Sequence, residues 1–196
     1  RHSELLLPMI DALLKEAGVK LAALDGIAFG AGPGSFTGLR IACGVTQGLA
    51  FGAGLPVAAV CTLEALAEDT DPAVTRAVCC FDARLGEIFH AAYVRDAGGW
   101  REVSPPVLTT PSAAPALAGE GWTGLGSGFA THGAALAQCY GAQLGDARAG
   151  VLPHARAVAA LGARAFARGE GVPAERAVPV YVRDKVAQTV AERAAR

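Results

Sequence analysis

The residues best suited to chemistry lie in one glycine-rich stretch, residues 26–40. Residues 27–29 read as the end of a buried strand, and residues 30–34 hold three glycines around a proline. Such a loop can adopt positive φ angles and let a ligand approach the backbone. A strand, a glycine-rich loop and a helix N-terminus together favour phosphate binding. The candidate residues are Gly32, Gly34, Ser35 and Thr37, with Ser35 also placed to cap the following helix.

The amino-acid sequence of this loop nevertheless differs from the common nucleotide-binding motifs. No Gly-x-x-x-x-Gly-Lys-Ser/Thr sequence is present, and Ser35 stands where Gly-x-Gly-x-x-Gly would end in glycine. The three lysines of the chain, Lys15, Lys20 and Lys185, all lie outside the loop. The loop therefore lacks the cation that usually meets a phosphate.

A second acidic motif, residues 82–87, forms a tight turn between two predicted strands. Asp82 and Glu87 could hold a metal–phosphate group, and Asp82 joins the candidate phosphate site on that ground. The alternative is structural, because such a pair commonly caps a turn and binds Arg84 or backbone amides.

No catalytic or metal-binding constellation is visible. The histidines, at positions 2, 90, 132 and 154, have neither the i, i+3 nor the i, i+4 spacing of a helical metal site. Residues 125–128 are not a nucleophile elbow, because Leu125 stands where Gly-x-Ser-x-Gly needs its first glycine. The five cysteines form no Cys-x-x-Cys pair and read as small core residues of a reducing cytoplasm. We therefore predict no metal site and no catalytic residue.

Two helices are unusual enough to indicate a partner. The helix predicted over residues 2–18 is apolar around most of its circumference, more than one buried face requires. The helix over residues 36–53 carries glycine at every fourth position of one face, where each glycine costs about 0.5–1 kcal/mol relative to alanine. Close packing on the chain's own sheet and contact with another subunit both explain this spacing. The candidate interface residues are Leu6, Met9, Ile10, Leu13, Gly44, Gly48 and Gly52.

The rest of the chain predicts alternating helices and strands. Residues 113–119 form a short helix at best, residues 126–129 a turn, and residues 130–150 give no clear pattern. A polar break at 69–72 marks the predicted boundary between two domains. The predicted strands are 55–61, 77–82, 88–94, one from residue 100, and 122–125; the remaining helices are 63–67, capped by Thr62, and 155–168; the domains are 1–72, 73–183 and a polar tail, 184–196.

Composition excludes several classes of protein. The chain has 196 residues, of which 52% are apolar, so it can bury a substantial core. A net charge of −1 and a pI near 6.5 give no basic footprint, so independent binding to nucleic acid is not expected. No apolar run is long enough to span a bilayer, and we expect a cytoplasmic protein without a membrane contact.

Residues 32–40, Gly-Pro-Gly-Ser-Phe-Thr-Gly-Leu-Arg, resemble the signature of the TsaB family, bacterial proteins of tRNA threonylcarbamoyladenosine biosynthesis. Residues 2–8, residues 82–87 with Tyr93, and the Pro-x-Tyr-x-Arg sequence at 179–183 resemble further family motifs. The resemblance implies an α/β fold with two lobes, that of the actin-like/sugar-kinase/Hsp70 superfold. It also implies that two or three strands, with a Leu-x-x-Asp-Thr-Ser-like turn, precede residue 1. We therefore expect the first lobe to lack those strands and residues 1–61 to expose apolar faces.

The resemblance further implies a non-catalytic scaffold subunit with no cofactor of its own. The helices over residues 2–18 and 36–53 would pair with a second copy or with the catalytic TsaD-type paralogue, whose His-x-x-x-His metal motif is absent here. A TsaE-type ATPase would join the assembly, tRNA would be contacted only through the complex, and ATP or ADP could sit at a subunit interface. Two alternatives from other classes remain, an actin-like ATPase or small-molecule kinase, and a peptidase.

Overall fold

A short parallel sheet forms the centre of the first lobe. In the computed structural model, which describes residues 2–182, strand β1 (Ile27–Gly32) pairs in parallel with β2 (Val57–Cys61). Helix α2 (Phe36–Ala53) makes the crossover between them. Its predicted ends are confirmed, because the Ser35 hydroxyl accepts a hydrogen bond from the Gly38 amide at 3.4 Å and Gly54 adopts a left-handed cap, φ 67°.

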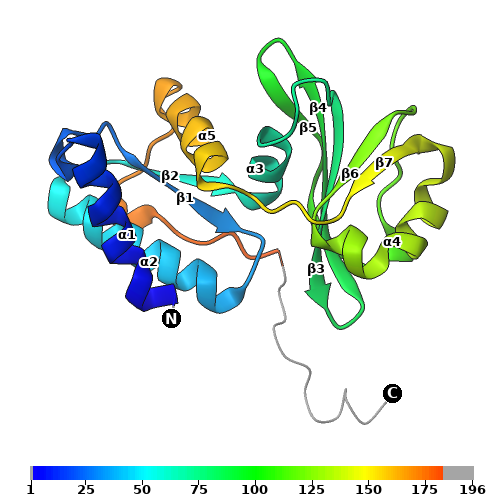
Figure 1. Cartoon of the computed structure of the whole chain (residues 1–196), viewed down its shortest axis with the longest axis horizontal. Coiled ribbons are helices and arrows are strands. Elements are labelled where there is room, and N and C mark those ends of the chain that lie inside the picture. Colours follow the sequence, from blue (N-terminus) through cyan, green and yellow to red (C-terminus); the bar gives the residue numbers. More distant parts are fainter. Residues whose placement is uncertain (1, 183–196) are drawn as a thin grey trace, which may run out of the picture.

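Helices α2 and α5 (Ala155–Ala167) both pack against this sheet (Figure 1). Close approach of α5 requires glycine at position 162, because a Cβ there would lie 2.3 Å from the Ala28 Cβ. The predicted range 73–183 assigned this helix to the second lobe, whereas α5 packs on β1 and β2. The reason is that the chain returns to the first sheet after β7, where Val172 pairs with Val57.

Helix α1 (His2–Ala17) lies along α2 and covers it only in part. Leu6, Ile10 and Leu14 are half-buried, whereas the side chains between them are exposed. The predicted helix over residues 2–18 is thus confirmed, and much of its apolar surface meets no other part of residues 4–182.

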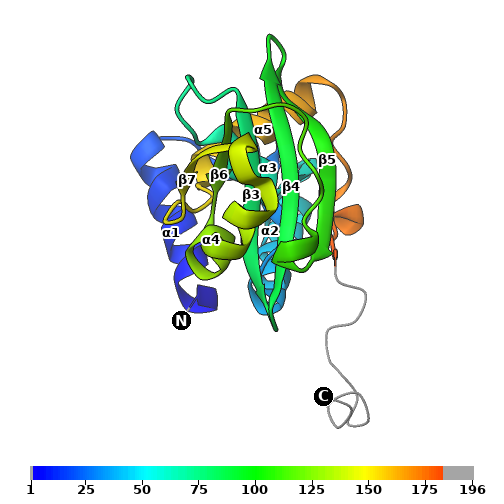
Figure 2. The same ribbon diagram turned by 90° about the vertical axis from the view of Figure 1, so that its right-hand side faces the viewer.

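The second lobe is a five-stranded mixed sheet in the order β5-β4-β3-β6-β7. Figure 2 shows it with α4 (Ser127–Tyr140) in front. Its outer strands carry residues that discourage further pairing, with Pro105 and Pro106 in β5, and Asp146 and Arg148 in β7. The strands are β3 (Arg76–Arg84), β4 (Glu87–Asp96), β5 (Gly99–Thr109), β6 (Trp122–Leu125) and β7 (Leu144–Arg148).

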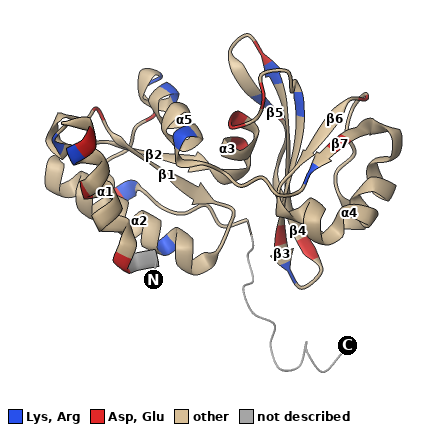
Figure 3. Cartoon of the chain, viewed as in Figure 1, with Lys and Arg blue, Asp and Glu red and all other residues tan. Residues whose placement is uncertain are grey.

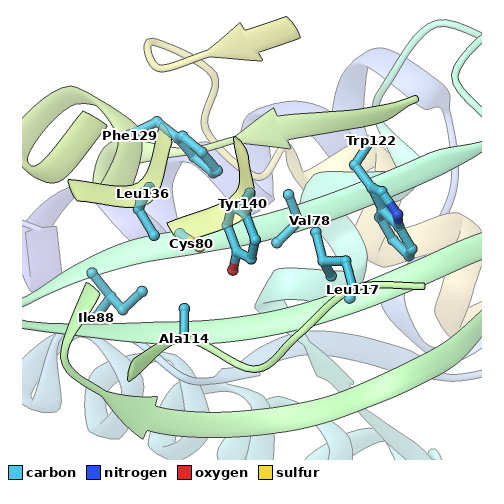
Figure 4. Packing of buried hydrophobic residues seen from close by; sticks show 10 residues of the cluster. Val78, Cys80, Ile88, Ala114, Leu117, Trp122, Phe129, Leu136 and Tyr140 are labelled. Atoms are coloured by element: carbon cyan, nitrogen blue, oxygen red, sulfur yellow. The ribbon is translucent and has the colours of Figure 1, made fainter. Parts of the chain in front are cut away.

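Helix α4 closes one face of this sheet over an apolar core. Figure 4 shows Tyr140, Leu136 and Phe129 of α4 packed over Val78 and Cys80 of β3, with Trp122 at the other end of the cluster. No clear pattern was predicted for this region, because alanine and glycine make up much of α4 and lower the contrast between its faces.

The short helix α3 (Thr62–Glu68) covers the other face and also reaches the first lobe. Leu63, Leu66 and Ala67 belong to the core of the second sheet, whereas Ala65 packs with Leu161 of α5. The prediction that Thr62 caps this helix is wrong. The helix follows Cys61 without a side-chain cap, and the Thr62 hydroxyl donates instead to the Pro33 carbonyl.

Short 3-10 turns complete the described chain. The helix considered over residues 113–119 does not form, since the regular structure there is a 3-10 turn that ends at Ala113. The proposed boundary near residue 72 stays a prediction. The four turns are η1 (Leu21–Ala23), η2 (Pro111–Ala113), η3 (Gly141–Gln143) and η4 (Ala174–Arg176).

His90 is fully buried in β4, beside the ring of Tyr140 at 6.4 Å between centroids. Neither ring nitrogen has a hydrogen-bond partner within residues 2–182, nor does the Tyr140 hydroxyl. Burial lowers the pKa of His90 from 6.5 to about 4, because the charged imidazolium would lose its hydration.

We predict that acid destabilises the fold through His90. Between about pH 6.5 and pH 4 the unfolded chain binds a proton at this residue and the folded chain does not, so stability falls as pH falls through that window. The loss is at most about 3 kcal/mol. Urea unfolding of the wild type and of His90→Phe at pH 7, 6, 5 and 4 measures it. An identical pH slope in both proteins would contradict the prediction.

Candidate functional site

A cleft with a volume of about 710 Å³ separates the two lobes. The loop after β1 forms one wall and the end of β3 forms the other. Of the five candidate phosphate residues, Gly34, Ser35 and Asp82 line the cleft, whereas Gly32 and Thr37 are not among its lining residues. The lining further includes Pro33, Phe36, Leu39, Thr62, Phe81, Arg84, Phe89, Ser127, Pro153, Val180, Tyr181 and Val182.

Structural contacts explain two of the residues that the sequence analysis assigned to phosphate binding. Gly32 has φ +124°, and a Cβ there would lie 2.6 Å from the Val180 carbonyl oxygen, so glycine is required where the C-terminal segment crosses. Val180 in turn donates its amide to the Ala31 carbonyl at 2.8 Å. The Ser35 hydroxyl already accepts from the first turn of α2. Packing at Gly32 and the helix cap at Ser35 thus explain these two residues without a ligand.

Arg40 packs with two aromatic residues, Phe36 and Tyr181, at the rim of the cleft. Its guanidinium lies 3.9 Å from the centroid of the Phe36 ring and donates a hydrogen bond to the Tyr181 hydroxyl at 3.1 Å. The Phe36 and Tyr181 rings are 5.9 Å apart. Because Tyr181 stands 141 positions after Arg40, the sequence carried no signal for this contact.

On the opposite wall Asp82 makes the turn-capping contacts of the structural alternative. Its Oδ1 accepts from the Arg84 amide at 3.0 Å, and its Oδ2 lies 3.4 Å from the Arg84 guanidinium. Residues Arg84 and Leu85 both adopt left-handed backbone angles, φ 65° and 56°, followed by Gly86 at 78°. The carboxylate therefore stabilises a strained turn.

Asp82 also meets helix α4, which sequence reasoning missed. The Asp82 amide donates to the Ser127 hydroxyl at 3.1 Å, and Oδ1 lies 3.5 Å from Nε2 of His132. His132 interrupts the regular helix, with φ −124° and ψ 22°. Both side chains of this pair are largely buried, at 13% and 19% exposure.

The segment predicted as a turn, residues 126–129, is the start of α4. Glycine is needed there because Gly126 has φ +99° and a Cβ would lie 2.6 Å from the Cys80 carbonyl oxygen. A Cβ on Gly128 would be 2.7 Å from the Cys80 Cβ. The first residues of α2 and of α4 therefore border the same cleft, and helix N-termini favour anions.

The charges lining the cleft match a polyphosphate poorly. Asp82 and Arg84 are its charged lining residues, and they face each other. Arg40, at the rim, is engaged with Phe36 and Tyr181. Phosphate binding by this chain alone therefore stays a prediction.

The cysteines do not provide an activated nucleophile in the core. Burial raises the pKa of the Cys79 and Cys80 thiols, which keeps them protonated at neutral pH. Burial likewise raises the pKa of Cys61 and Cys43. Among residues 2–182, no group of three or more His, Cys, Asp or Glu side chains is placed to bind a metal ion.

The second candidate site is the outer surface of α1 and α2, which we call the α1–α2 face. Met9 and Leu13 of α1 are 59% and 62% exposed, whereas the predicted interface residues Leu6 and Ile10 turn partly inward. Figure 3 shows charged residues of both signs on α1. α1 carries Glu4, Asp11, Lys15 and Glu16, whereas Arg40 is the charged residue of α2. Phe51 at the end of α2 is 79% exposed.

The glycines of α2 have open space beside them. A Cβ built on Gly44, Gly48 or Gly52 meets no atom within 4 Å. Close packing on the chain's own sheet, one of the two explanations of this spacing, is thus not what the fold uses these glycines for. All three glycines are exposed, and the exposed side chain of Phe51 stands next to Gly52.

A larger cavity, about 920 Å³, runs along β1 and α5. Its lining is mainly apolar, with Val158 and Phe166 on one side and Ala28 and Phe29 on the other. Asp25 is its charged lining residue. This composition provides no set of groups for catalysis.

Known proteins with similar sequences and structures agree with the two-lobed fold described above. A profile of the TsaD family, described as tRNA N6-adenosine threonylcarbamoyltransferase, matches residues 1–121. The chain is 36% identical over 193 residues to the tRNA threonylcarbamoyladenosine biosynthesis protein TsaB of Escherichia coli, covering 95% of this chain and 82% of that protein. It is 40% identical over 123 residues to the TsaB of Haemophilus influenzae, covering 58% of this chain and 52% of that protein.

Two solved structures from Pseudomonas aeruginosa share the fold. YeaZ superposes with a TM-score of 0.82 and 41% identity, covering 92% of this chain and 84% of that chain. A protein described as similar to peptidase YEAZ gives a TM-score of 0.86 and 40% identity, covering 93% of this chain and 85% of that chain.

Fold and comparisons together define a two-lobed α/β protein of the actin-like superfold. The chain belongs to the TsaB family of tRNA threonylcarbamoyladenosine biosynthesis proteins. The resemblance in residues 32–40 and 82–87 identified that family correctly. Within residues 2–182, no helix has both the length and the apolar character required to cross a bilayer.

We predict that the turn after β3 gains stability when its backbone strain is relieved. Leu85 is 58% exposed at φ 56°, a conformation that glycine adopts without the steric cost that a Cβ imposes. Leu85→Gly is expected to be more stable than Leu85→Ala by about 1 kcal/mol. Urea unfolding measures both variants, which lose the same exposed side chain. An alanine variant as stable as the glycine variant would contradict the prediction.

Proposed function

We propose that this chain is a non-catalytic subunit of the tRNA threonylcarbamoyladenosine modification machinery, and that it pairs with a TsaD-type transferase through the α1–α2 face. The α1–α2 face is the observation that carries the proposal. Exposed apolar patches on soluble proteins mark interaction sites, and the open glycines allow a partner to approach the helix backbone closely.

The chemistry of the cleft supports a non-catalytic role. The candidate phosphate-loop residue Ser35 caps a helix, the thiols of Cys79 and Cys80 are buried, and the Asp82 carboxylate caps a turn. Each group has a contact that explains its presence without a reaction. In this proposal the transfer reaction belongs to the partner.

The assembly follows the expectations of the family. The TsaD-type paralogue and a second copy of this chain compete for the same α1–α2 face, a TsaE-type ATPase joins the larger complex, and tRNA is bound through the complex. The net charge of −1 supports that last point, since the chain has no surplus of cations for RNA. We place this assembly in the cytoplasm. ATP or ADP would bind at the joint between subunits, because the cleft itself offers few cations.

The first test is Gly48→Leu in α2. Nothing lies within 4 Å of a Cβ at this position, and leucine favours helix over glycine, so we expect the folded monomer to be at least as stable as the wild type. We expect the homodimer and the complex with the TsaD-type paralogue to be lost, because the branched side chain holds the partner helix away. Gel filtration with light scattering measures assembly.

The matched control is Gly133→Leu. Gly133 is a glycine of α4 in the second lobe, and a Cβ there also meets no atom within 4 Å. This variant should assemble as the wild type does. Unchanged assembly of Gly48→Leu, or equal loss in both variants, would refute the proposed interface.

The second test measures function in cells. An Escherichia coli strain depleted of its own TsaB should recover threonylcarbamoyladenosine in its tRNA when this chain is expressed together with the TsaD-type paralogue of the same source. Gly48→Leu should fail to restore the nucleoside and Gly133→Leu should restore it. Mass spectrometry of digested tRNA gives the readout.

The enzymatic alternatives predict different results with the isolated chain. Steady ATP turnover that disappears in Asp82→Ala would favour an actin-like ATPase or kinase. Casein hydrolysis sensitive to a chelator would favour a peptidase. Under the proposed function, neither activity accompanies the purified subunit.

A further inference from the structure

A group of charged residues joins the two lobes on the side where α5, α3 and β5 meet. Nη2 of Arg164, on α5, lies 2.7 Å from Oε2 of Glu68, on α3. The same guanidinium lies 3.9 Å from the Cβ position of Gly99, at the turn between β4 and β5. Figure 3 shows acidic residues on α3 beside basic residues on α5. Arg164 thus pairs with α3 and lies beside the β4–β5 turn.

Glu64 interacts with four charged side chains of this group. Burial raises the pKa of Glu64, on α3, and the charges of Glu68 and Glu102 raise it further, whereas Arg164 acts against them as the stronger of two nearby cations. Arg168 is the weaker one, and it also pairs with Glu170 through two contacts of 2.7 Å at the end of α5. Without Arg164, the carboxylates of α3 and β5 would repel one another in a partly buried region.

The surrounding contacts keep each element of this group in place. Arg156 of α5 lies 2.7 Å from Asp69, directly after α3. On the sheet side, Arg95 stacks on the ring of Trp100 at 4.4 Å and donates to the Val74 carbonyl at 3.0 Å. The contacts of Arg95 therefore hold the β4–β5 hairpin near its base, whereas Arg164 of α5 lies beside its turn.

We propose that Arg164 is a latch between the lobes: its guanidinium neutralises the carboxylates of α3 and β5 and so fixes α5 against both. The side chain is well placed for that role. Arg164 is 39% exposed and Glu68 17%, so water screens the pair only in part. Nη2 is buried and makes no well-directed hydrogen bond within residues 2–182, so the contact is one of charge. The latch fixes the angle of the cleft whether or not a partner is bound, and the inference is independent of the proposed function.

Hydrogen exchange of the full chain tests the latch. In Arg164→Met we expect amides of residues 62–70 and 96–102 to exchange about tenfold faster, an effect between those of exposed and buried ion pairs. Amides of β6 and α4 should keep their wild-type rates. Arg168→Met is the matched control, since it removes the arginine that directly follows α5 and forms its salt bridge with Glu170.

A charge reversal separates the latch from simple loss of packing. Arg164→Glu should open the same segments further, and Arg164→Glu combined with Glu68→Arg should bring their exchange back toward the wild-type rates. Should Arg164→Met fail to fold, Arg164→Lys and the double reversal decide. Wild-type exchange in Arg164→Met, an equal effect of Arg168→Met, or no recovery in the double reversal would overturn the proposal.

Discussion

The burial of α3 on two sides is the constraint on which the rest of this structure depends. Leu63, Ala65, Leu66 and Ala67 are all fully or almost fully buried, although the helix has only 7 residues. Leu63 and Leu66 complete the core of the five-stranded sheet, while Ala65 faces α5. Because one short helix serves two cores, the two lobes cannot shift independently without exposing apolar surface on both sides. The Thr62 hydroxyl, bound to the Pro33 carbonyl, adds the glycine-rich loop to the same junction.

This junction determines which helical surfaces are buried within the chain and which stay exposed. α5 and α2 use the two-stranded sheet, and α3 occupies the face of the larger sheet opposite α4. Among the described elements α1 packs mainly on α2, and Met9 and Leu13 stay exposed. The contrast between two helical glycines shows the same division: a Cβ on Gly162 would collide with Ala28, whereas one on Gly48 would meet nothing within 4 Å. The fold requires glycine at position 162, whereas no neighbouring atom among the described residues requires it at position 48.

The cleft shows how a fold associated with phosphate chemistry can keep its geometry without the matching charges. Two helix N-termini border the cleft, as an anion site would require. The side chains that could have completed such a site are engaged elsewhere, Ser35 in its helix cap and Arg40 with Tyr181. Asp82, buried beside His132, adds negative charge where a phosphate would need positive charge.

The family, the ends of α2 and most strands could be predicted from the residues alone, because glycine, proline and capping residues act over a few positions, as at Ser35 and Gly54. The composition of α1 and α2 also indicated that these helices are unusual. The folded chain was needed to show that α5 returns to the first sheet, that His132 reaches Asp82, and that the glycines of α2 face open space. Those facts depend on contacts between residues far apart in the chain, and the alanine-rich segments that make them carry too little contrast between faces to predict their neighbours.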